Sequence, residues 1–418
     1  MRHYIHSLAL RARIHEPCFA NLQLESKTMN RITILAFLLA TTFIPSTLFA
    51  QAETEPRSAP DANVLDAQTW KQLDNSVERG LAWLLTKQRD DGSFETIANG
   101  QPAVTSFCLL AFLANGESPS DGQYKQQLSK AVDFIMAQQT TNGLIALGAP
   151  NGVSVPRKVD HESMGVSGAY NHAISALALA EVYGHCEPAQ AKKLAPVIEQ
   201  AIVATLEMQS WGGKPQHDVG GWRYLDDWNK SKSDLSITGW QLMFLRSAKG
   251  AGFDTPETSI DAAVQFVENC FLKGADRKVH GYTVGTPDFV TRAMAGAGVL
   301  ALAHAGKHNS KEALASADWI LKHDFSNYNV DKPLYGEYWS PDRYHYGAVI
   351  CTQAMFQIGG KYWEQFFPPL VNVLLANQKA DGSWPPEIRD AKFGSCYTTS
   401  LSILSLSVPN QMLPIFQR

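Results

Sequence analysis

The chain alternates between two kinds of helix-forming segment, separated by loops that contain glycine and aromatic residues. One kind is amphipathic, with Lys, Glu and Gln along one face, and the other is apolar nearly all round. A helix that is apolar on every side must be buried on every side, whereas an amphipathic helix covers a core with one face. The amphipathic segments are 73–88, 128–139, 194–209, 260–271, 313–323 and 366–378, and the apolar ones are 103–115, 169–183, a helix ending at Gly250, 290–305, 344–358 and 396–407.

These segments come in pairs, which predicts an internal repeat of very roughly 50 residues over about residues 70–410. An open stack of repeats needs polar cap repeats at its ends, and none is visible in the sequence. We therefore expect an all-α fold, an (α/α)6 toroid of about six helix hairpins with the apolar helices in an inner ring. Five apolar segments also end at a glycine, which adopts the left-handed conformation after a helix at no steric cost. These glycines are Gly116, Gly184, Gly250, Gly306 and Gly359.

Composition narrows the class of protein. Apolar residues make up 45% of the 418 residues and charged residues 18%, which suits a large core and excludes a disordered chain. The formal net charge is -4 and no basic stripe is present, so we expect no nucleic-acid partner.

The N-terminal segment has the pattern of a secretory signal. Arg31 precedes an apolar run over 32–44, and Ala50-Gln51-Ala52 fits cleavage before Glu53. The run is shorter than the roughly 20 residues of a membrane span. We expect a leader at 1–52 that starts at Met1 or Met29, a linker at 53–69, the toroid at 70–410 and a C-terminal tail at 411–418. The mature protein would then be periplasmic or secreted, without a transmembrane span.

The cysteines predict no disulfide framework. After the leader their number is odd and no C-x-x-C spacing occurs, so a zinc knuckle is not indicated either. We expect most of them to be small buried apolar residues. They are Cys108, Cys186, Cys270, Cys351 and Cys396.

A short motif follows several of the amphipathic segments. Its clearest forms are Gln88-Arg-Asp-Asp-Gly-Ser-Phe94 and Gln378-Lys-Ala-Asp-Gly-Ser-Trp384, and looser forms begin at Gln139 and Gln209. The motif resembles the QW motifs of squalene–hopene cyclases and the related pattern of protein prenyltransferase β-subunits, and the resemblance covers about residues 70–410. It implies the α/α toroid fold. We expect the Gln amide to bind free backbone groups at the helix end while the aromatic ring covers them.

In such a toroid the inner helices run parallel, so their N-terminal ends gather at one mouth of the central cavity. A polar, aromatic-rich ring above an apolar barrel is typical of a ligand pocket. The alternative is that Ser, Thr and Asp at these positions are N-caps. The predicted ligand-binding residues are Tyr170, His172, Trp222, Thr238, Tyr344, Tyr346, Cys396 and Tyr397.

The resemblance also allows a comparison with the cyclase acid. These cyclases protonate an alkene with an Asp-x-Asp-Asp-Thr-Ala motif after a Gly-Gly-Trp turn. Here Asp234 and Thr238 match the motif after Gly220-Gly221-Trp222, whereas Ser236 and Ile237 replace the other two carboxylates. Alkene protonation needs a very strong acid, which a carboxyl pair provides by splitting its pKa values. The sequence therefore predicts that cyclase activity is lost.

Prenyltransferases instead hold a catalytic zinc with an Asp-x-Cys pair and a His. Gly394-Ser395-Cys396 resembles the Cys element but has glycine in place of the Asp, and Asp342-Arg-Tyr-His345 resembles the His element in the wrong repeat. A catalytic zinc site normally has three protein ligands. We expect no cofactor, with zinc at His172, His345 and Cys396 as the weak alternative.

The sequence thus predicts a toroid that binds a hydrophobic or amphiphilic small molecule, or a peptide segment, in its central cavity, without cyclase activity. Two enzyme classes remain open: an isoprenoid-modifying cyclase or transferase with altered catalytic residues, and a polysaccharide-active α/α-barrel enzyme. For an enzyme, the catalytic candidates are Asp234, His345 and Arg292. Arg292 would also add to the positive potential of the helix N-termini and favour an anionic head group.

Overall fold

The structure is a computed structural model that describes residues 63–146, 165–225, 231–274, 277–285, 289–328 and 342–417. The chain divides into two compact units, Met1–Pro56 and Arg57–Arg418, and the described residues all belong to the second. The predicted leader at 1–52 and most of the predicted linker lie outside the described residues.

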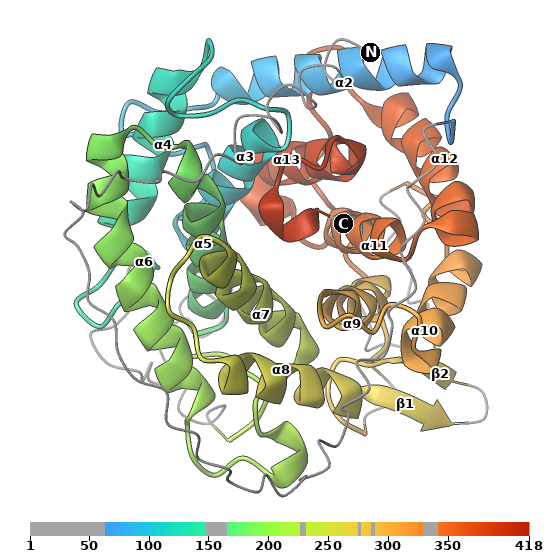
Figure 1. The fold of residues 1–418 in the computed structure, drawn as a ribbon. Helices are drawn as coiled ribbons and strands as arrows, with labels where there is room; N and C mark the ends of the chain where they lie inside the picture. The colour runs from blue at the N-terminus through green and yellow to red at the C-terminus, as the bar shows by residue number, and fades with distance from the viewer. Residues whose placement is uncertain are drawn as a thin grey trace, which may run out of the picture. The chain divides into compact units, whose positions relative to one another are not determined.

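Six of the described helices form a closed inner ring (Figure 1). They are α3 (Ala103–Leu113), α5 (Ser167–Val182), α7 (Leu235–Gly250), α9 (Arg292–His304), α11 (Tyr344–Ile358) and α13 (Gly394–Leu406). Each packs against the next, and α13 packs back against α3. Almost every residue of these helices is buried, as their uniformly apolar sequences require.

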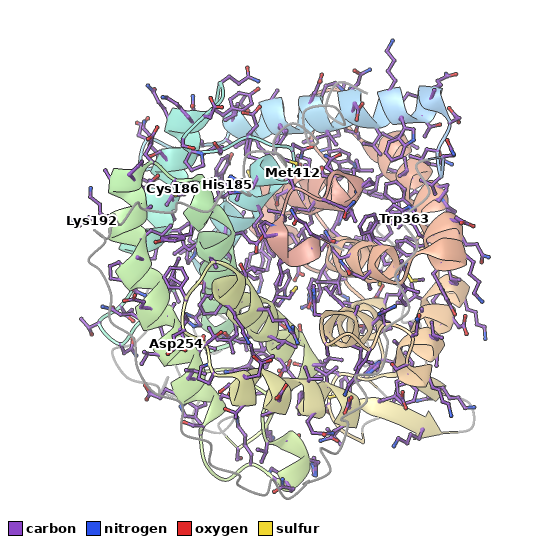
Figure 2. All side chains as sticks on the ribbon, in the orientation of Figure 1. His185, Cys186, Lys192, Asp254, Trp363 and Met412 are labelled. Carbon is purple, nitrogen blue, oxygen red and sulfur yellow. The ribbon has the colours of Figure 1, made fainter. Side chains whose placement is uncertain are left out.

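A second set of helices wraps this inner ring. It consists of α2 (Ala67–Leu85), α4 (Lys125–Ala137), α6 (Pro188–Gln209), α8 (Glu257–Asn269), α10 (Lys311–Lys322) and α12 (Gly360–Asn377). Each contacts two neighbouring inner helices or one inner and one outer neighbour, and α12 also contacts α2. This confirms the predicted all-α toroid. Side chains occupy the space between the helices, as Figure 2 shows for Trp363 on α12.

The inner helices run parallel. Ser236, in the first turn of α7, hydrogen-bonds both Tyr170 in the first turn of α5 and Tyr346 in the first turn of α11. At the opposite end, Ser247 near the end of α7 donates to Glu181 near the end of α5. N-terminal ends therefore meet N-terminal ends, which gives the ring one N-terminal mouth, as expected.

The glutamine motif joins successive repeats. Each of the four Gln amides donates to the carbonyl of the motif glycine and to a backbone carbonyl of the following outer helix. The pairs of acceptors are Gly92 and Gln127 for Gln88, Gly143 and Val197 for Gln139, Gly220 and Ser259 for Gln209, and Gly382 and Ser76 for Gln378. The last pair links the sixth repeat to α2 in the first, so the motif also closes the ring.

Some element boundaries differ from the predictions. The first helix begins at Ala67 rather than at residue 73, because the Asp66 side chain caps it by accepting from the Thr69 N–H at 2.8 Å. The predicted loop through residue 280 contains a two-stranded antiparallel hairpin, β1 (Phe271–Gly274) and β2 (Arg277–His280). The prediction missed it because these strands lack a clear two-residue alternation.

The glycine C-caps are confirmed at Gly116, Gly306 and Gly359, which have positive φ. The prediction was wrong at Gly184 and Gly250. Gly184 lies in a 3-10 turn, Tyr183–His185, and α7 includes Gly250, so that the left-handed position falls on Gly252.

The C-terminal segment crosses the far end of the inner ring. A short helix, η8 (Pro414–Phe416), packs against α7, and its residues Ile415 and Phe416 are buried. Gln357, at the end of α11, donates to the Phe416 carbonyl at 2.8 Å. Part of the predicted tail at 411–418 therefore belongs to the core, through Leu413, Ile415 and Phe416.

Two further expectations concern membranes and cysteines. No helix within the described residues is both long and apolar enough to cross a membrane. Cys108, Cys270, Cys351 and Cys396 are buried, Cys186 is half-buried, and all five have free thiols, which confirms the prediction of buried single cysteines.

Candidate functional site

The N-terminal mouth of the ring carries a hydroxyl network. Ser236 lies 2.8 Å from the Tyr170 hydroxyl and 3.0 Å from the Tyr346 hydroxyl, so one small side chain connects three inner helices. Ser236 is buried, whereas Tyr170 and Tyr346 are half-buried. Burial raises the pKa of Tyr346 to about 12 and that of Tyr170 well above its ordinary value, so both phenols stay protonated and can donate hydrogen bonds.

An apolar lining lies below this network. The Tyr346 ring stacks on Trp240 with centroids 6.0 Å apart, and Phe107 packs edge-on against Trp240 and against Tyr397. A cavity beside Trp240 and Tyr346, between α7, α9 and α11, has a volume of about 10 Å³, room for about one water. Its walls are Ser236, Gly239, Trp240, Leu242, Met243, Ala297, Leu300, Ala301, His304, Tyr346 and Ile350. The lining therefore changes from hydroxyls to apolar groups at Tyr346, going from the mouth into the ring.

Asp234 is fully buried beside the mouth. One carboxylate oxygen caps α7 by accepting from the Ile237 N–H at 2.9 Å, and the other accepts from Arg223 at 2.9 Å. The Arg223 guanidinium lies over the rings of Tyr224 and Tyr282, whose hydroxyls hydrogen-bond each other. Burial raises the pKa of Asp234 above its ordinary value, and the Arg223 charge opposes that shift. Both oxygens are thus engaged within the protein.

Arg343 supplies an accessible positive charge at the same end of the ring. It immediately precedes α11, and 45% of its side chain is exposed. Its Nε lies 2.6 Å from the carboxylate of Asp390, and its charge also interacts with the phenols of Tyr170 and Tyr397. These contacts place the guanidinium close to the mouth. Nothing in the sequence distinguished Arg343 from the other arginines, since its position depends on how α11 packs.

A third cluster contains His345, one of the predicted catalytic residues. Its Nδ1 lies 3.1 Å from a carboxylate oxygen of Glu387, and its Nε2 lies 3.1 Å from the Tyr328 hydroxyl. His345 and Glu387 are buried and Tyr328 is half-buried. Glu387 and Tyr328 were missed at the sequence level. They lie in connecting segments 42 and 17 residues from His345, and no motif relates them to it.

Arg292, a predicted catalytic residue, is buried at the N-terminal end of α9. Its guanidinium pairs with Asp342 at 2.5 Å, donates to the Asp324 carbonyl and stacks on the Phe325 ring at 3.8 Å. Its backbone N–H also binds Asp342 at 3.0 Å. The side chain therefore joins the start of α9 to the segment after α10 and to the segment before α11, whereas Arg343 is exposed.

The structure separates the predicted ligand-binding residues into two groups. Tyr170 and Tyr346 line the mouth, and Tyr397 lies close behind Phe107. The remaining side chains are buried in contacts within the protein. These contacts are Trp222 Nε1 to the Thr205 carbonyl, Thr238 to the Trp222 N–H, Tyr344 to the Phe325 carbonyl, and His172 to Ile145 and Thr205. The Cys396 side chain is buried in the core.

No group of three or more His, Cys, Asp or Glu side chains that could bind a metal occurs in the described part of the chain. The weak zinc candidates His172, His345 and Cys396 do not come together there. His172 accepts from the Ile145 N–H at 3.1 Å and contacts Thr205 at 2.9 Å, and burial lowers its pKa to about 3. Its imidazole is therefore neutral and engaged at both nitrogens.

Solved structures place this geometry in a class. No family model matches the chain, and no sequence relative was found among curated proteins. The fold is similar to that of a D-mannose isomerase, with a TM-score of 0.57 and 12% identity over 84% of this chain and 100% of that chain. It is also similar to that of a variant of the type II terpene cyclase MstE from Scytonema in complex with geranylgeranyl dihydroxybenzoate, with a TM-score of 0.54 and 13% identity over 83% of this chain and 99% of that chain.

A third likeness is to an inactive variant of an α-1,6-mannanase of Salegentibacter in complex with α-1,6-mannotriose. The TM-score is 0.54, with 11% identity over 81% of this chain and 99% of that chain. These proteins have different activities, and at such low identity the likenesses show the fold alone. They define the class of this protein as an α/α toroid.

Proposed function

We propose that this protein is an exported α/α toroid that binds an amphiphilic small molecule at the mouth formed by the N-terminal ends of its inner helices. The observation that carries the proposal is the change of lining at Tyr346. Its hydroxyl belongs to the network of Ser236 and Tyr170, while its ring stacks on Trp240 at the top of the apolar walls. A ligand with a polar head and an apolar chain fits this order of groups.

The polar head is expected to bind at Arg343. This guanidinium is accessible, and its partner Asp390 leaves the outer N–H groups available for a carboxylate or similar anion. The hydroxyls of Tyr170 and Tyr346 provide further donors nearby. An anionic head therefore suits the mouth better than a neutral one.

The apolar part of the ligand requires the inner lining to open. With about 10 Å³ between the walls, a hydrocarbon chain enters only when Trp240 and Tyr346 separate. The terpene cyclase MstE, whose described ligand joins an apolar chain to a benzoate, supports this ligand class by analogy.

We propose further that cyclase activity is absent. The acid that protonates an alkene must be protonated and must face the substrate. Asp234 instead caps α7 with one oxygen and pairs with Arg223 through the other. Ser236 stands where the cyclase motif has another carboxylate, and its hydroxyl is hydrogen-bonded to the hydroxyls of Tyr170 and Tyr346. This arrangement binds polar groups but supplies no strong acid.

The test uses cis-parinaric acid, a fluorescent fatty acid, and its methyl ester. We expect the mature protein to bind the acid, and Arg343→Gln to weaken that binding about tenfold while ester binding changes little. Lys392→Gln is the matched control. Lys392 is a second cation near the N-terminal end of an inner helix, α13, and its ammonium lies over the Phe393 ring. Equal affinities of wild type and Arg343→Gln for the acid would contradict the head-group assignment.

Two more measurements address the remaining parts of the proposal. Calorimetric binding of α-1,6-mannotriose without binding of the fatty acid would favour the carbohydrate alternative. N-terminal sequencing of protein recovered from a bacterial periplasm is expected to begin at Glu53, and an uncleaved cytoplasmic product would contradict export.

A further inference from the structure

Tyr328, His345 and Glu387 are connected in series. The Glu387 carboxylate lies 3.1 Å from His345 Nδ1 and also accepts from the His345 backbone N–H at 3.2 Å, which fixes the orientation of the ring. Because a carboxylate accepts hydrogen bonds and cannot donate them, the imidazole proton is on Nδ1. Nε2 is then an acceptor, and the group that faces it at 3.1 Å is the hydroxyl of Tyr328.

The Glu387 carboxylate, 3.1 Å from Nδ1, can stabilise a positive charge that forms on the His345 imidazole when Nε2 takes up a proton. Glu387 is buried, and its second carboxylate oxygen has no hydrogen-bond partner among the described residues. The two arginines close by are paired with other carboxylates, Arg292 with Asp342 and Arg343 with Asp390. His345 contacts the Glu387 carboxylate directly, and a buried carboxylate is stabilised by a neighbouring group that can become positive.

We propose that Tyr328, His345 and Glu387 form a proton relay in which Tyr328 is a catalytic base for a hydroxyl-bearing ligand. As the Tyr328 oxygen takes the proton of the ligand hydroxyl, the proton of Tyr328 passes to His345 Nε2. The products are the ligand alkoxide and an imidazolium beside the Glu387 carboxylate, so one proton moves at each step and charge is conserved. His345 and Glu387 are positioning residues that act through Tyr328.

The structure distinguishes this role from simple packing. Tyr344 packs against the same His345 ring, with centroids 5.3 Å apart, but its hydroxyl donates to the Phe325 carbonyl at 2.8 Å and is fully used. Tyr328 is half-buried, and its hydroxyl oxygen keeps lone pairs for a second contact. Burial and the Glu387 charge raise the pKa of Tyr328 above its ordinary value, so without the relay this phenol would be less nucleophilic than a surface tyrosine.

The reactivity of the Tyr328 phenol therefore reports whether the relay operates. A test of this reactivity requires no knowledge of the substrate and does not depend on the amphiphilic ligand proposed above. An arylsulfonyl fluoride reacts with a base-activated phenol, forming the sulfonate ester as fluoride leaves and the phenol proton passes to the base. Labelling at pH 7.5 followed by peptide mass spectrometry measures the rate at Tyr328. We expect Tyr328 to react faster than the half-buried Tyr183, which lies in the turn after α5.

Variants of the relay sharpen the test. His345→Gln and Glu387→Gln are each expected to slow labelling of Tyr328 by about 10²-fold, the usual scale of general-base assistance. His323→Gln is the matched control, because His323 stacks on Trp319 outside the relay and should leave the rate unchanged. Labelling of Tyr183 reports in each variant whether the fold persists. A Tyr328 rate at or below that of Tyr183 in wild type, or one unchanged in Glu387→Gln, would overturn the proposal.

Discussion

Glu181 accepts a hydrogen bond from the backbone N–H of Ile415 at 3.3 Å, although 234 residues separate them in the chain. The same carboxyl group accepts from Ser247 at 2.5 Å. One buried side chain therefore joins α5, α7 and the C-terminal segment at the end of the ring opposite the mouth. The C-terminal segment therefore packs on the inner ring at this end.

The free energy of unfolding should depend on pH through the buried carboxyl group of Glu181. Burial raises the pKa of Glu181 from 4.5 to about 7. Between these pH values the folded state holds a proton that the unfolded state has released, so stability present below pH 4.5 is lost as the pH rises to about 7. The loss is on the order of 3 kcal/mol in the free energy of unfolding. Urea unfolding of wild type and Glu181→Gln from pH 4.5 to 8 should show this loss in wild type alone.

Glu268→Gln is the control for that experiment, because Glu268 pairs with Lys307 at the surface of α8. Its pH dependence should match that of wild type. If Glu181→Gln lost stability over the same pH range as wild type, the titration of Glu181 would not be the cause.

The glycines of the glutamine motif should tolerate no side chain. Gly220 has φ +92°, and a Cβ there would overlap the backbone carbonyl of Ala262 in α8. We expect Gly220→Ala to lower the free energy of unfolding by at least about 3 kcal/mol, since backbone strain and a clash with an outer helix add. Thermal unfolding measures the effect.

Gly306→Ala provides the comparison. Gly306 has a similar φ of +75°, but no atom lies within 4 Å of the position of a Cβ. It should cost only the strain of the left-handed conformation, about 1–2 kcal/mol. Equal losses for the two variants would show that the close approach of α8 contributes nothing.

The pair of Asp234 and Arg223 should couple energetically. Asp234→Asn keeps an N-cap for α7 but leaves the Arg223 guanidinium partly buried beside a neutral amide. In a double-mutant cycle with Arg223→Gln we expect a coupling energy of about 1–3 kcal/mol. The double variant should lose less stability than the sum of the losses in the two single variants. A coupling near zero would assign Asp234 to capping alone.

The sequence by itself determined the all-α toroid, because its signals are local. Apolar and amphipathic helices alternate along the chain. In three of the four motifs the glutamine amide donates to the carbonyl of a glycine four residues further on. A positive-φ glycine lets the chain pass close to the next helix. Such features repeat along the chain and need no knowledge of distant contacts.

The tertiary structure decided which side chains reach the mouth. Tyr344, His345 and Tyr346 are consecutive, yet they point in three directions, because successive residues of a helix lie about 100° apart. Tyr346 meets Ser236, His345 meets Glu387 and Tyr344 meets the Phe325 carbonyl. These partners come from α7, from the segment between α12 and α13, and from the segment after α10. Only the packing of the two rings brings such distant segments together, since no local pattern in the chain encodes which side chains will meet.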